Sequence, residues 1–256
     1  MKRMKATIAY DGSGFAGYQI QLKTRTVQLE LLRALKELHK GEPVEVVASG
    51  RTDSGVHATG QVIHFDTPFT MPKESWVRAL NVRLPQDIQV YDVEQADAEF
   101  HARYHAKGKI YRYKWNRSKL INPFSRNHLV HVPQEIDVSR MEKAAEAFIG
   151  THDFSSFCAA NTNVVDKVRT IWRIDFEEHG EELHMVIEGS GFLYNMVRII
   201  AGTLLEVGLN RREPEELAAI IAACDRDAAG KRIGRRRAEA HRQAEGSRRR
   251  STPPHA

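Results

Sequence analysis

What this 256-residue sequence lacks excludes two classes of protein. Its two cysteines, Cys158 and Cys224, form no Cys-x-x-Cys pair, so neither a disulfide framework nor a zinc knuckle is indicated. No apolar run approaches the roughly 20 residues that span a bilayer. The N-terminus "MKRMKATIAYDG" also lacks the apolar segment of a signal peptide. We therefore expect a soluble, cytoplasmic protein with reduced thiols and no membrane partner.

Motifs for cofactors are missing as well. Glycine-rich stretches occur at 11–17 and 189–192, but neither follows the GxGxxG or GxxxxGK[ST] patterns that bind phosphates. His101 and His105 have a spacing that suits a metal on a helix, yet the region is irregular and no third ligand is evident. We expect no metal and no nucleotide cofactor.

Positive charge is concentrated in two segments. Residues 231–256 hold nine Lys or Arg against two Glu, so the formal net charge of +5 does not describe the rest of the chain. Residues 101–131 hold eight Lys or Arg and no acidic residue, with aromatic residues interleaved. Because cations pair with phosphates and rings stack on unpaired bases, this stretch predicts contact with RNA. The alternative is a solvated edge strand.

Hydrophobic periodicity predicts an α+β fold of two ferredoxin-like or RRM-like halves, residues 1–104 and 105–230. The first half has expected strands at 4–10, 44–49, 60–67 and 88–96 and helices at 26–41 and 71–84. The second has expected strands at 108–117, 170–178 and 182–189 and helices at 137–150, 191–208 and 213–224. We expect mainly antiparallel sheets around a central cleft, with helices on the outer face. The Arg-rich residues 231–256 are expected to be disordered.

Arg198 and Asp53 stand out for their surroundings. Arg198 lies on a helix that is otherwise apolar nearly all round, and a buried guanidinium needs an anionic partner. Any nearby acid serves that purpose, so an internal salt bridge is the alternative to a functional role. Asp53 precedes Ser54-Gly55, a turn signature, and these three residues alone favour a turn-closing role. Arg51 is placed to hold a phosphate or to orient the carboxylate, and an Asp paired with a buried Arg has the properties of a nucleophile or base.

Seven stretches match, in order, the pattern of a known family. They are "IAYDGSGFAGYQ" (8–19), "TVQ" (26–28), "ASGRTDSGVHATGQVIHF" (48–65), "NVRLPQDI" (81–88), "AKGKIYRYKW" (106–115), "FIGTHDFSSF" (148–157) and "GSGFLYNMVRIIAGTLLEVG" (189–208). On these residues the chain resembles the bacterial tRNA pseudouridine synthase A family, from residue 1 to about residue 230. Family members then continue into a final strand, whereas this chain becomes Arg-rich. We expect a frame-shifted or artefactual terminus there, and a genuine RNA-binding tail is the alternative.

The resemblance implies an isomerase that converts uridine to pseudouridine at positions 38, 39 and 40 of the tRNA anticodon stem-loop, as a homodimer without a cofactor. It makes Asp53 the catalytic aspartate, Arg198 its paired cation and Tyr111 the ring that stacks on the flipped base. Arg51 would guide or extrude the base. Phosphate contacts are expected from Lys109, Arg112 and Lys114.

Two other functions are compatible with parts of this pattern. The first is a non-catalytic RNA-binding protein on the same fold, in which Asp53 only closes a turn. The second is a glycoside hydrolase, but that chemistry normally uses a second carboxylate, and none accompanies Asp53 in its motif.

Overall fold

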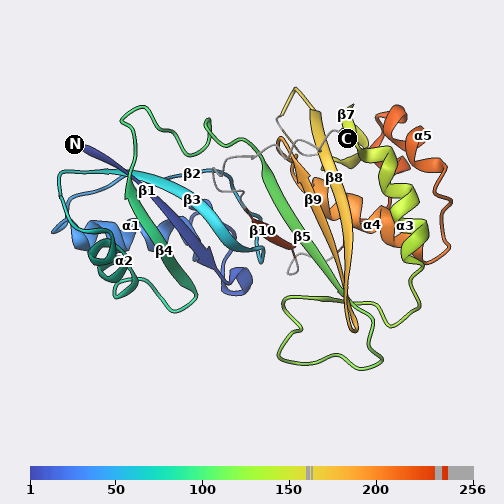
Figure 1. The fold of residues 1–256 in the computed structure, drawn as a ribbon, viewed down its shortest axis with the longest axis horizontal. Helices are drawn as coiled ribbons and strands as arrows, with labels where there is room; N and C mark the ends of the chain where they lie inside the picture. The colour runs from blue at the N-terminus through green and yellow to red at the C-terminus, as the bar shows by residue number, and fades with distance from the viewer. Residues whose placement is uncertain (160–161, 163, 234–237, 242–256) are drawn as a thin grey trace, which may run out of the picture.

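The computed structural model describes residues 1–159, 162, 164–233 and the backbone of 238–241. Figure 1 shows two groups of elements side by side. The first group contains β1 (Lys2–Tyr10), α1 (Val27–Leu38), β2 (Val47–Ala48), β3 (His57–Thr67), α2 (Lys73–Asn81) and β4 (Ile88–Gln95). The second contains β5 (Lys109–Asn116), β6 (Val130–His131), α3 (Val138–Ala145), β7 (Gly150–Asp153), β8 (Val168–His179), β9 (Glu182–Gly189), α4 (Met196–Gly208) and α5 (Glu216–Ala223). Within the described residues, no helix is long and apolar enough to cross a membrane.

The strands form a sheet in the order β4-β1-β3-β10-β5-β9-β8-β7, in which β10 (Ala238–His241) joins the two groups. Strand β1 is antiparallel to β3 and β4, and β9 is antiparallel to β5 and β8. The parallel pairings involve β10 with β3 and β6 with β5. The predicted α+β class with mainly antiparallel strands is therefore confirmed.

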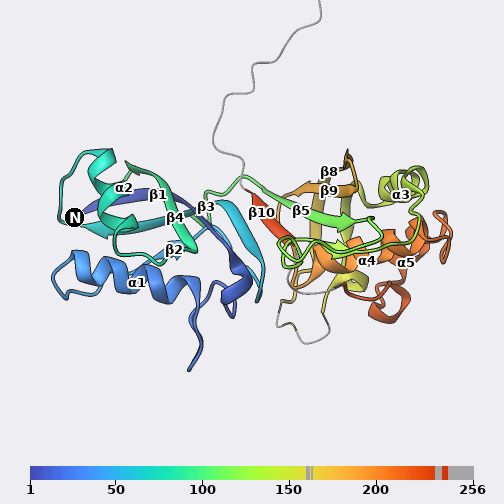
Figure 2. The ribbon, with the colours of Figure 1, turned by 90° about the horizontal axis from the view of Figure 1, so that it is seen from below.

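Each group has its own hydrophobic core. Trp76 of α2 packs among the side chains of α1, β1 and β3, while Tyr113 and Trp115 of β5 pack with the residues of α3 and α4. Val56, in the loop before β3, belongs to the second core and so connects the two groups. Helices α1 and α2 lie at one end of the molecule and α3 and α5 at the other, in agreement with the expected outer helices (Figures 1 and 2). The domain boundary after residue 104 stays a prediction.

Helix α4 is shorter than predicted. It begins at Met196 rather than near residue 191, because Asn195 has a φ of +62° and so lies in the left-handed region. That conformation interrupts the helical hydrogen-bond pattern. Arg198 consequently lies in the first turn of α4 instead of its middle, close to the end of the helix where the amide groups are unpaired.

The expected disorder of residues 231–256 is wrong for part of that segment. Ala238–His241 forms β10, which is parallel to β3 and antiparallel to β5. Main-chain groups make these pairings, so an Arg-rich composition does not prevent them. The carbonyl of Ile233 also accepts hydrogen bonds from a side chain of α4. Residues 234–237 and 242–256 lie outside the described residues.

Candidate active site

A cavity of about 810 Å³ is lined by both groups of elements. Its wall includes the loop before β3, one face of β5 and the first turn of α4. The predicted site residues that line it are Arg51, Asp53, Lys109, Tyr111 and Arg198. Folding therefore brings the predicted carboxylate, the aromatic ring and three cations to one cavity, whose size is within the range of small-ligand sites.

Asp53 begins a tight turn. The amide of Val56 donates a hydrogen bond to the Asp53 carbonyl at 3.1 Å. Gly55, the third residue of the turn, has a φ of +74°, which glycine adopts without steric cost. The predicted turn is confirmed for the backbone, and the half-buried side chain of Asp53 lines the cavity.

The loop after β1 braces this turn. The amide of Tyr18 donates to the Thr52 carbonyl at 3.0 Å, and the amide of Gly55 donates to the Phe15 carbonyl at 3.3 Å. A Cβ on Gly17 would lie 2.9 Å from the Thr52 carbonyl oxygen, so the two backbones approach too closely for a side chain. The glycine-rich stretch of this loop therefore packs against the turn.

Side chains fix the rest of the Asp53 loop. The hydroxyl groups of Tyr10 and Thr52 lie 2.7 Å apart, and Gln61 Nε2 donates to the Gly50 carbonyl at 2.8 Å. Lys109 of β5 packs on the same loop, since a Cβ on Gly50 would lie 2.8 Å from Lys109 Nζ. The loop is held from both sides, by β1 and β3 on one and by β5 on the other.

Tyr111 lies on the face of β5 that turns toward the cavity and the second core. Tyr113 and Trp115 follow on this face and are fully buried, as expected from the alternation of side chains along a strand. The ring of Tyr111 meets the ring of Phe192 edge-on, with 5.2 Å between centroids. Burial, and to a smaller extent the charge of Asp53, raises the pKa of Tyr111 to about 12. The phenol is therefore neutral at physiological pH and lies near the Asp53 carboxylate.

Arg198 is buried in the part of the cavity wall that α4 forms. Its Nη1 donates to Asn195 Oδ1 at 2.6 Å, while Nε and Nη2 donate to the Ile233 carbonyl at 3.0 and 2.6 Å. The positive end of the α4 dipole lies in the same wall. The ion pair between Arg198 and Asp53 stays a prediction, supported by their position on one cavity.

Positive charge exceeds negative charge in this wall. The charged residues that line it are the cations Arg51, Arg103, Lys109 and Arg198 and the acids Glu45 and Asp53. Burial, followed by the charges of Arg103 and Arg169, lowers the pKa of Lys109. A wall of this kind attracts an anion such as a nucleic-acid backbone.

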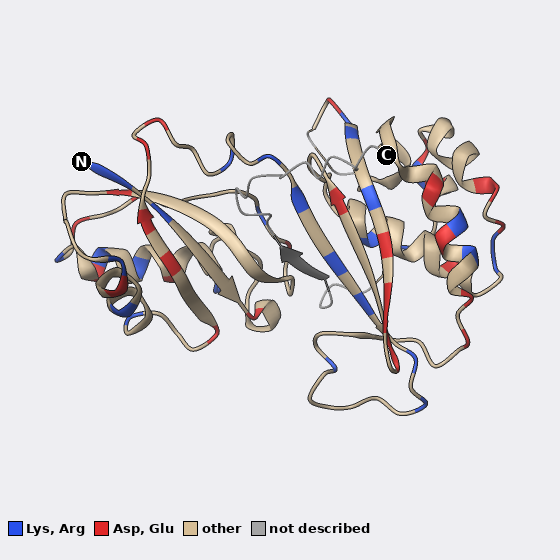
Figure 3. Ribbon diagram, in the orientation of Figure 1, with Lys and Arg blue, Asp and Glu red and all other residues tan. Residues whose placement is uncertain are grey.

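Arg112 and Lys114 do not line the cavity, because they project from the opposite face of β5. Arg112 pairs with Glu177 of β8 at 3.3 Å. Figure 3 shows basic positions along β5 beside acidic positions on β8 and β9. Acidic residues from distant parts of the sequence therefore balance some of the charge of the basic stretch.

Strand β10 lies between the strand that follows Asp53 and the strand that carries Tyr111. Ala240 is paired with Ala58 of β3 on one side and with Tyr111 of β5 on the other. Since neighbouring strands are about 4.8 Å apart, β10 holds β3 and β5 roughly 10 Å apart. Sequence reasoning missed this strand, and with it the element that sets the width of the site.

Comparison with known proteins identifies the family. Residues 6–105 and 144–242 match the family model described as tRNA pseudouridine synthase. The chain belongs to this family. The match reaches residue 242 and so includes β10, beyond the limit near residue 230 that the sequence motifs indicated.

Several curated relatives carry the name tRNA pseudouridine synthase A. The protein of Lysinibacillus sphaericus is 59% identical over 232 residues, which are 90% of this chain and 94% of that protein. The protein of Halalkalibacterium halodurans is 54% identical over 90% of this chain and 88% of its own length, and that of Bacillus pumilus is 54% identical over 90% and 93%. The predicted family is confirmed, and with it an RNA-modifying isomerase in preference to a non-catalytic RNA-binding protein.

Among solved structures, a chain of the Cbf5-Nop10-Gar1 complex can be superposed on this one. The superposition covers 93% of this chain and 57% of that chain. The TM-score is 0.34 and the sequence identity is 10%. A match this distant adds nothing to the family assignment.

Proposed function

We propose that this chain converts uridine to pseudouridine at positions 38–40 of the tRNA anticodon stem-loop, with Asp53 as the catalytic residue. The observation that carries the proposal is the cavity that gathers Asp53, Tyr111 and several cations. A carboxylate, an aromatic ring and positive charge are the groups needed to react with a nucleotide, to hold its base and to bind its phosphates.

The reaction breaks the bond between uracil N1 and ribose C1′ and forms a bond between C5 and C1′. N1 gains a proton and C5 loses one, so the isomerisation is redox-neutral. Asp53 acts either as a nucleophile or as the base that removes the C2′ proton. In a stacked stem N1 and C1′ are out of reach of a side chain, so the nucleotide must flip out of the helix.

The other residues of the cavity have supporting roles in this proposal. Tyr111 stacks on the detached uracil while it turns, and exposed Arg51 guides the base inward. Arg198, held by Asn195 and the Ile233 carbonyl, keeps the Asp53 carboxylate ionised and oriented. Phosphate contacts come from Lys109 inside the cavity, and from Arg112 and Lys114 on the outer face of β5.

We further infer that the protein is cytoplasmic and that each chain has two domains, residues 1–104 and 105–230. Two such chains form a homodimer that binds tRNA. The separate hydrophobic cores support the division into domains, and the resemblance to the family supports the dimer. Sedimentation of the purified chain tests the dimer, and a monomeric mass at micromolar concentration would contradict it.

Release of tritium from tRNA labelled at uracil C5 tests the activity, because the C5 proton leaves when C5 bonds to C1′. We expect wild type to release the label and Asp53→Asn to lose at least roughly 1000-fold in rate. Glu45→Gln is the matched control, since it removes the other carboxylate of the same wall and should keep the activity. If wild type releases no more tritium than Asp53→Asn, the proposed function is wrong.

A further inference from the structure

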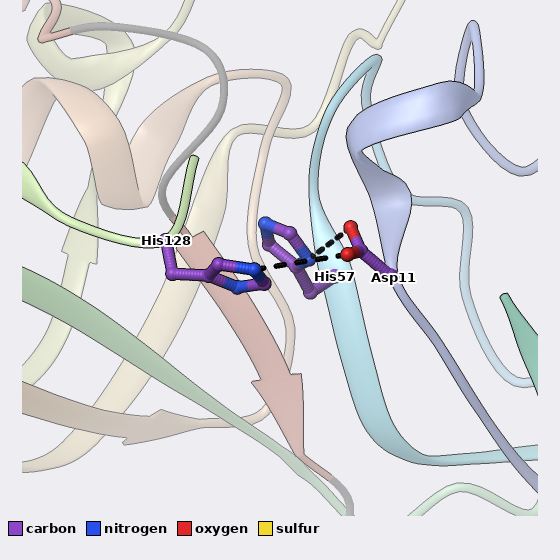
Figure 4. A group of neighbouring side chains, drawn as sticks. All are labelled: Asp11, His57 and His128. Atoms are coloured by element: carbon purple, nitrogen blue, oxygen red, sulfur yellow. Dashed lines mark ion pairs between the residues drawn. The ribbon is translucent and has the colours of Figure 1, made fainter. Parts of the chain in front are cut away.

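Three side chains with metal-binding groups meet outside the cavity. They are Asp11 after β1, His57 at the start of β3 and His128 in the loop between β5 and β6 (Figure 4). Their ligand atoms all lie within 4.8 Å of one another. We propose that this group, called here the Asp11 cluster, binds a divalent transition metal ion such as Zn²⁺.

The distances in the Asp11 cluster suit tetrahedral coordination. Asp11 Oδ1 lies 3.1 Å from His57 Nδ1, and Asp11 Oδ2 lies 3.7 Å from His128 Nε2. Ligand atoms about 2.0 Å from a tetrahedral Zn²⁺ are about 3.3 Å from each other. The two imidazole centroids are 4.3 Å apart. Shifts of a few tenths of an ångström at these two contacts, and a rotation of the two rings that points one nitrogen of each at a common centre, would bring the cluster to this geometry.

Nδ1 is the nitrogen of His57 that faces Asp11. The amide of Gly12 donates to His57 Nδ1 at 3.2 Å, and His57 Nε2 lies 3.2 Å from the Asn127 carbonyl, which requires the proton on Nε2. The lone pair of His57 Nδ1 therefore accepts the Gly12 N–H, and the Asp11 carboxylate lies beside it. Two electron-pair donors 3.1 Å apart are stabilised by a cation between them, which takes the place of the Gly12 amide at Nδ1.

The side chains of the cluster are of types that can hold a metal ion. Imidazole and carboxylate together are a common ligand set for Zn²⁺, and three protein ligands leave a fourth position for water.

One ligand of the Asp11 cluster is fixed in the sheet, and another is open to solvent. The side chain of His57 is 7% exposed and fixed in β3, whereas that of His128 is 44% exposed, so an ion can reach the site from solution. The three ligands come from segments far apart in the sequence, and a bound ion would cross-link them. One of these segments is β3, whose first residue, His57, stands four positions after Asp53.

A second group of ligand-type side chains serves as a control. Glu177, His179 and His184 meet the same distance condition, but all three belong to the β8–β9 hairpin. The guanidinium of Arg112 pairs with Glu177 at 3.3 Å and places a positive charge at that carboxylate, which disfavours a metal ion there.

Titration of the full chain with ZnCl₂, after removal of metals with a chelator, tests the proposal. We expect one equivalent to bind and the melting temperature to rise by roughly 5–10 °C when free Zn²⁺ is about 100 times its Kd. Co²⁺ should give the visible absorption bands of a tetrahedral site. His128→Ala should abolish both effects, whereas His179→Ala should change neither.

Three results would overturn the proposal. The first is no metal uptake by wild type. The second is uptake that survives His128→Ala, and the third is uptake that His179→Ala also removes. Asp11→Asn provides a second variant of nearly unchanged shape that should weaken binding at least roughly tenfold, and unaltered affinity would count against the site. Tritium release plays no part in these measurements, so their outcome is independent of the proposed function.

Discussion

The buried hydroxyl groups of Tyr10 and Thr52 lie 2.7 Å apart, one on β1 and the other next to Asp53. Tyr10→Phe removes this contact and deprives the buried Thr52 hydroxyl of its partner, so we expect a loss of about 1–2 kcal/mol in the free energy of unfolding. Urea denaturation measures this difference. Tyr91→Phe is the control, because Tyr91 is 63% exposed on β4 and should change stability by less than about 0.5 kcal/mol. Equal effects of the two variants would contradict the prediction.

Alanine substitutions at Gly17 and Gly41 distinguish the effect of backbone strain from the effect of a steric clash at the site. Both have positive φ, +112° and +101°, so alanine should cost about 1–2 kcal/mol of stability at each position. A Cβ meets the Thr52 carbonyl only at Gly17, whereas nothing lies within 4 Å at Gly41. We therefore expect Gly17→Ala to reduce tritium release at least roughly tenfold and Gly41→Ala to leave it unchanged. Full activity of Gly17→Ala would show that this approach does not position Asp53.

Replacement of Tyr111 distinguishes stacking from acid–base chemistry. Because burial raises the pKa of Tyr111 to about 12, the phenol stays protonated below roughly pH 11 and gives no step in the pH–rate profile under working conditions. Tyr111→Phe should therefore keep most of the activity with the same pH profile, and Tyr111→Ala should lose at least roughly 100-fold. A large loss in Tyr111→Phe would assign a chemical role to the hydroxyl.

His64 makes the fold sensitive to acid in a defined window. Burial, followed by the charges of Arg3 and His101, lowers the pKa of His64 to about 4, against 6.5 for a free histidine. Between these values the unfolded chain binds a proton that the folded chain does not, so the free energy of unfolding falls as the pH drops from 6.5 to 4. In His64→Asn this part of the fall should disappear.

Urea denaturation at several pH values measures the effect of His64. His179→Asn, on an exposed residue of β8, should give a curve parallel to that of wild type. A wild-type curve that is flat between pH 6.5 and 4 relative to His64→Asn would contradict the lowered pKa.

Two truncated chains test the contribution of the C-terminal segment. A chain that ends at residue 230 loses β10 and the Ile233 carbonyl that accepts from the buried Arg198 guanidinium. We expect it to be less stable by at least about 2 kcal/mol. A chain that ends at His241 keeps these contacts and should be as stable as the full chain in thermal and urea unfolding. Equal stability of all three chains would show that β10 contributes little.

Local sequence patterns predicted the parts of the site that depend on chemistry or on short-range structure. The turn at Asp53 follows from Ser54-Gly55, and the side-chain alternation of β5 places Tyr111 on the same face as Tyr113. The start of α4 was misplaced because Asn195 adopts a left-handed conformation, which its apolar surroundings in the sequence do not reveal.

The remaining features depend on contacts between distant segments. The strand β10 has no hydrophobic alternation, and its partners β3 and β5 supply the reason for it to be a strand. Likewise, Asp11, His57 and His128 have no spacing that suggests a metal site, and only the fold brings them together. The pairing of Arg112 with Glu177 is a third example, because periodicity does not reveal which charges on other strands oppose each other.

The position of β10 has a consequence for how the protein is made. This strand follows every other described strand in the sequence, yet it lies in the middle of the sheet. As the chain leaves the ribosome, β3 and β5 therefore have unpaired edges until the last strand arrives. The first group can fold early, but the space between Asp53 and Tyr111 takes its final width only when synthesis has passed His241. A nascent or prematurely terminated chain would lack the complete site and would offer two open strand edges to other chains.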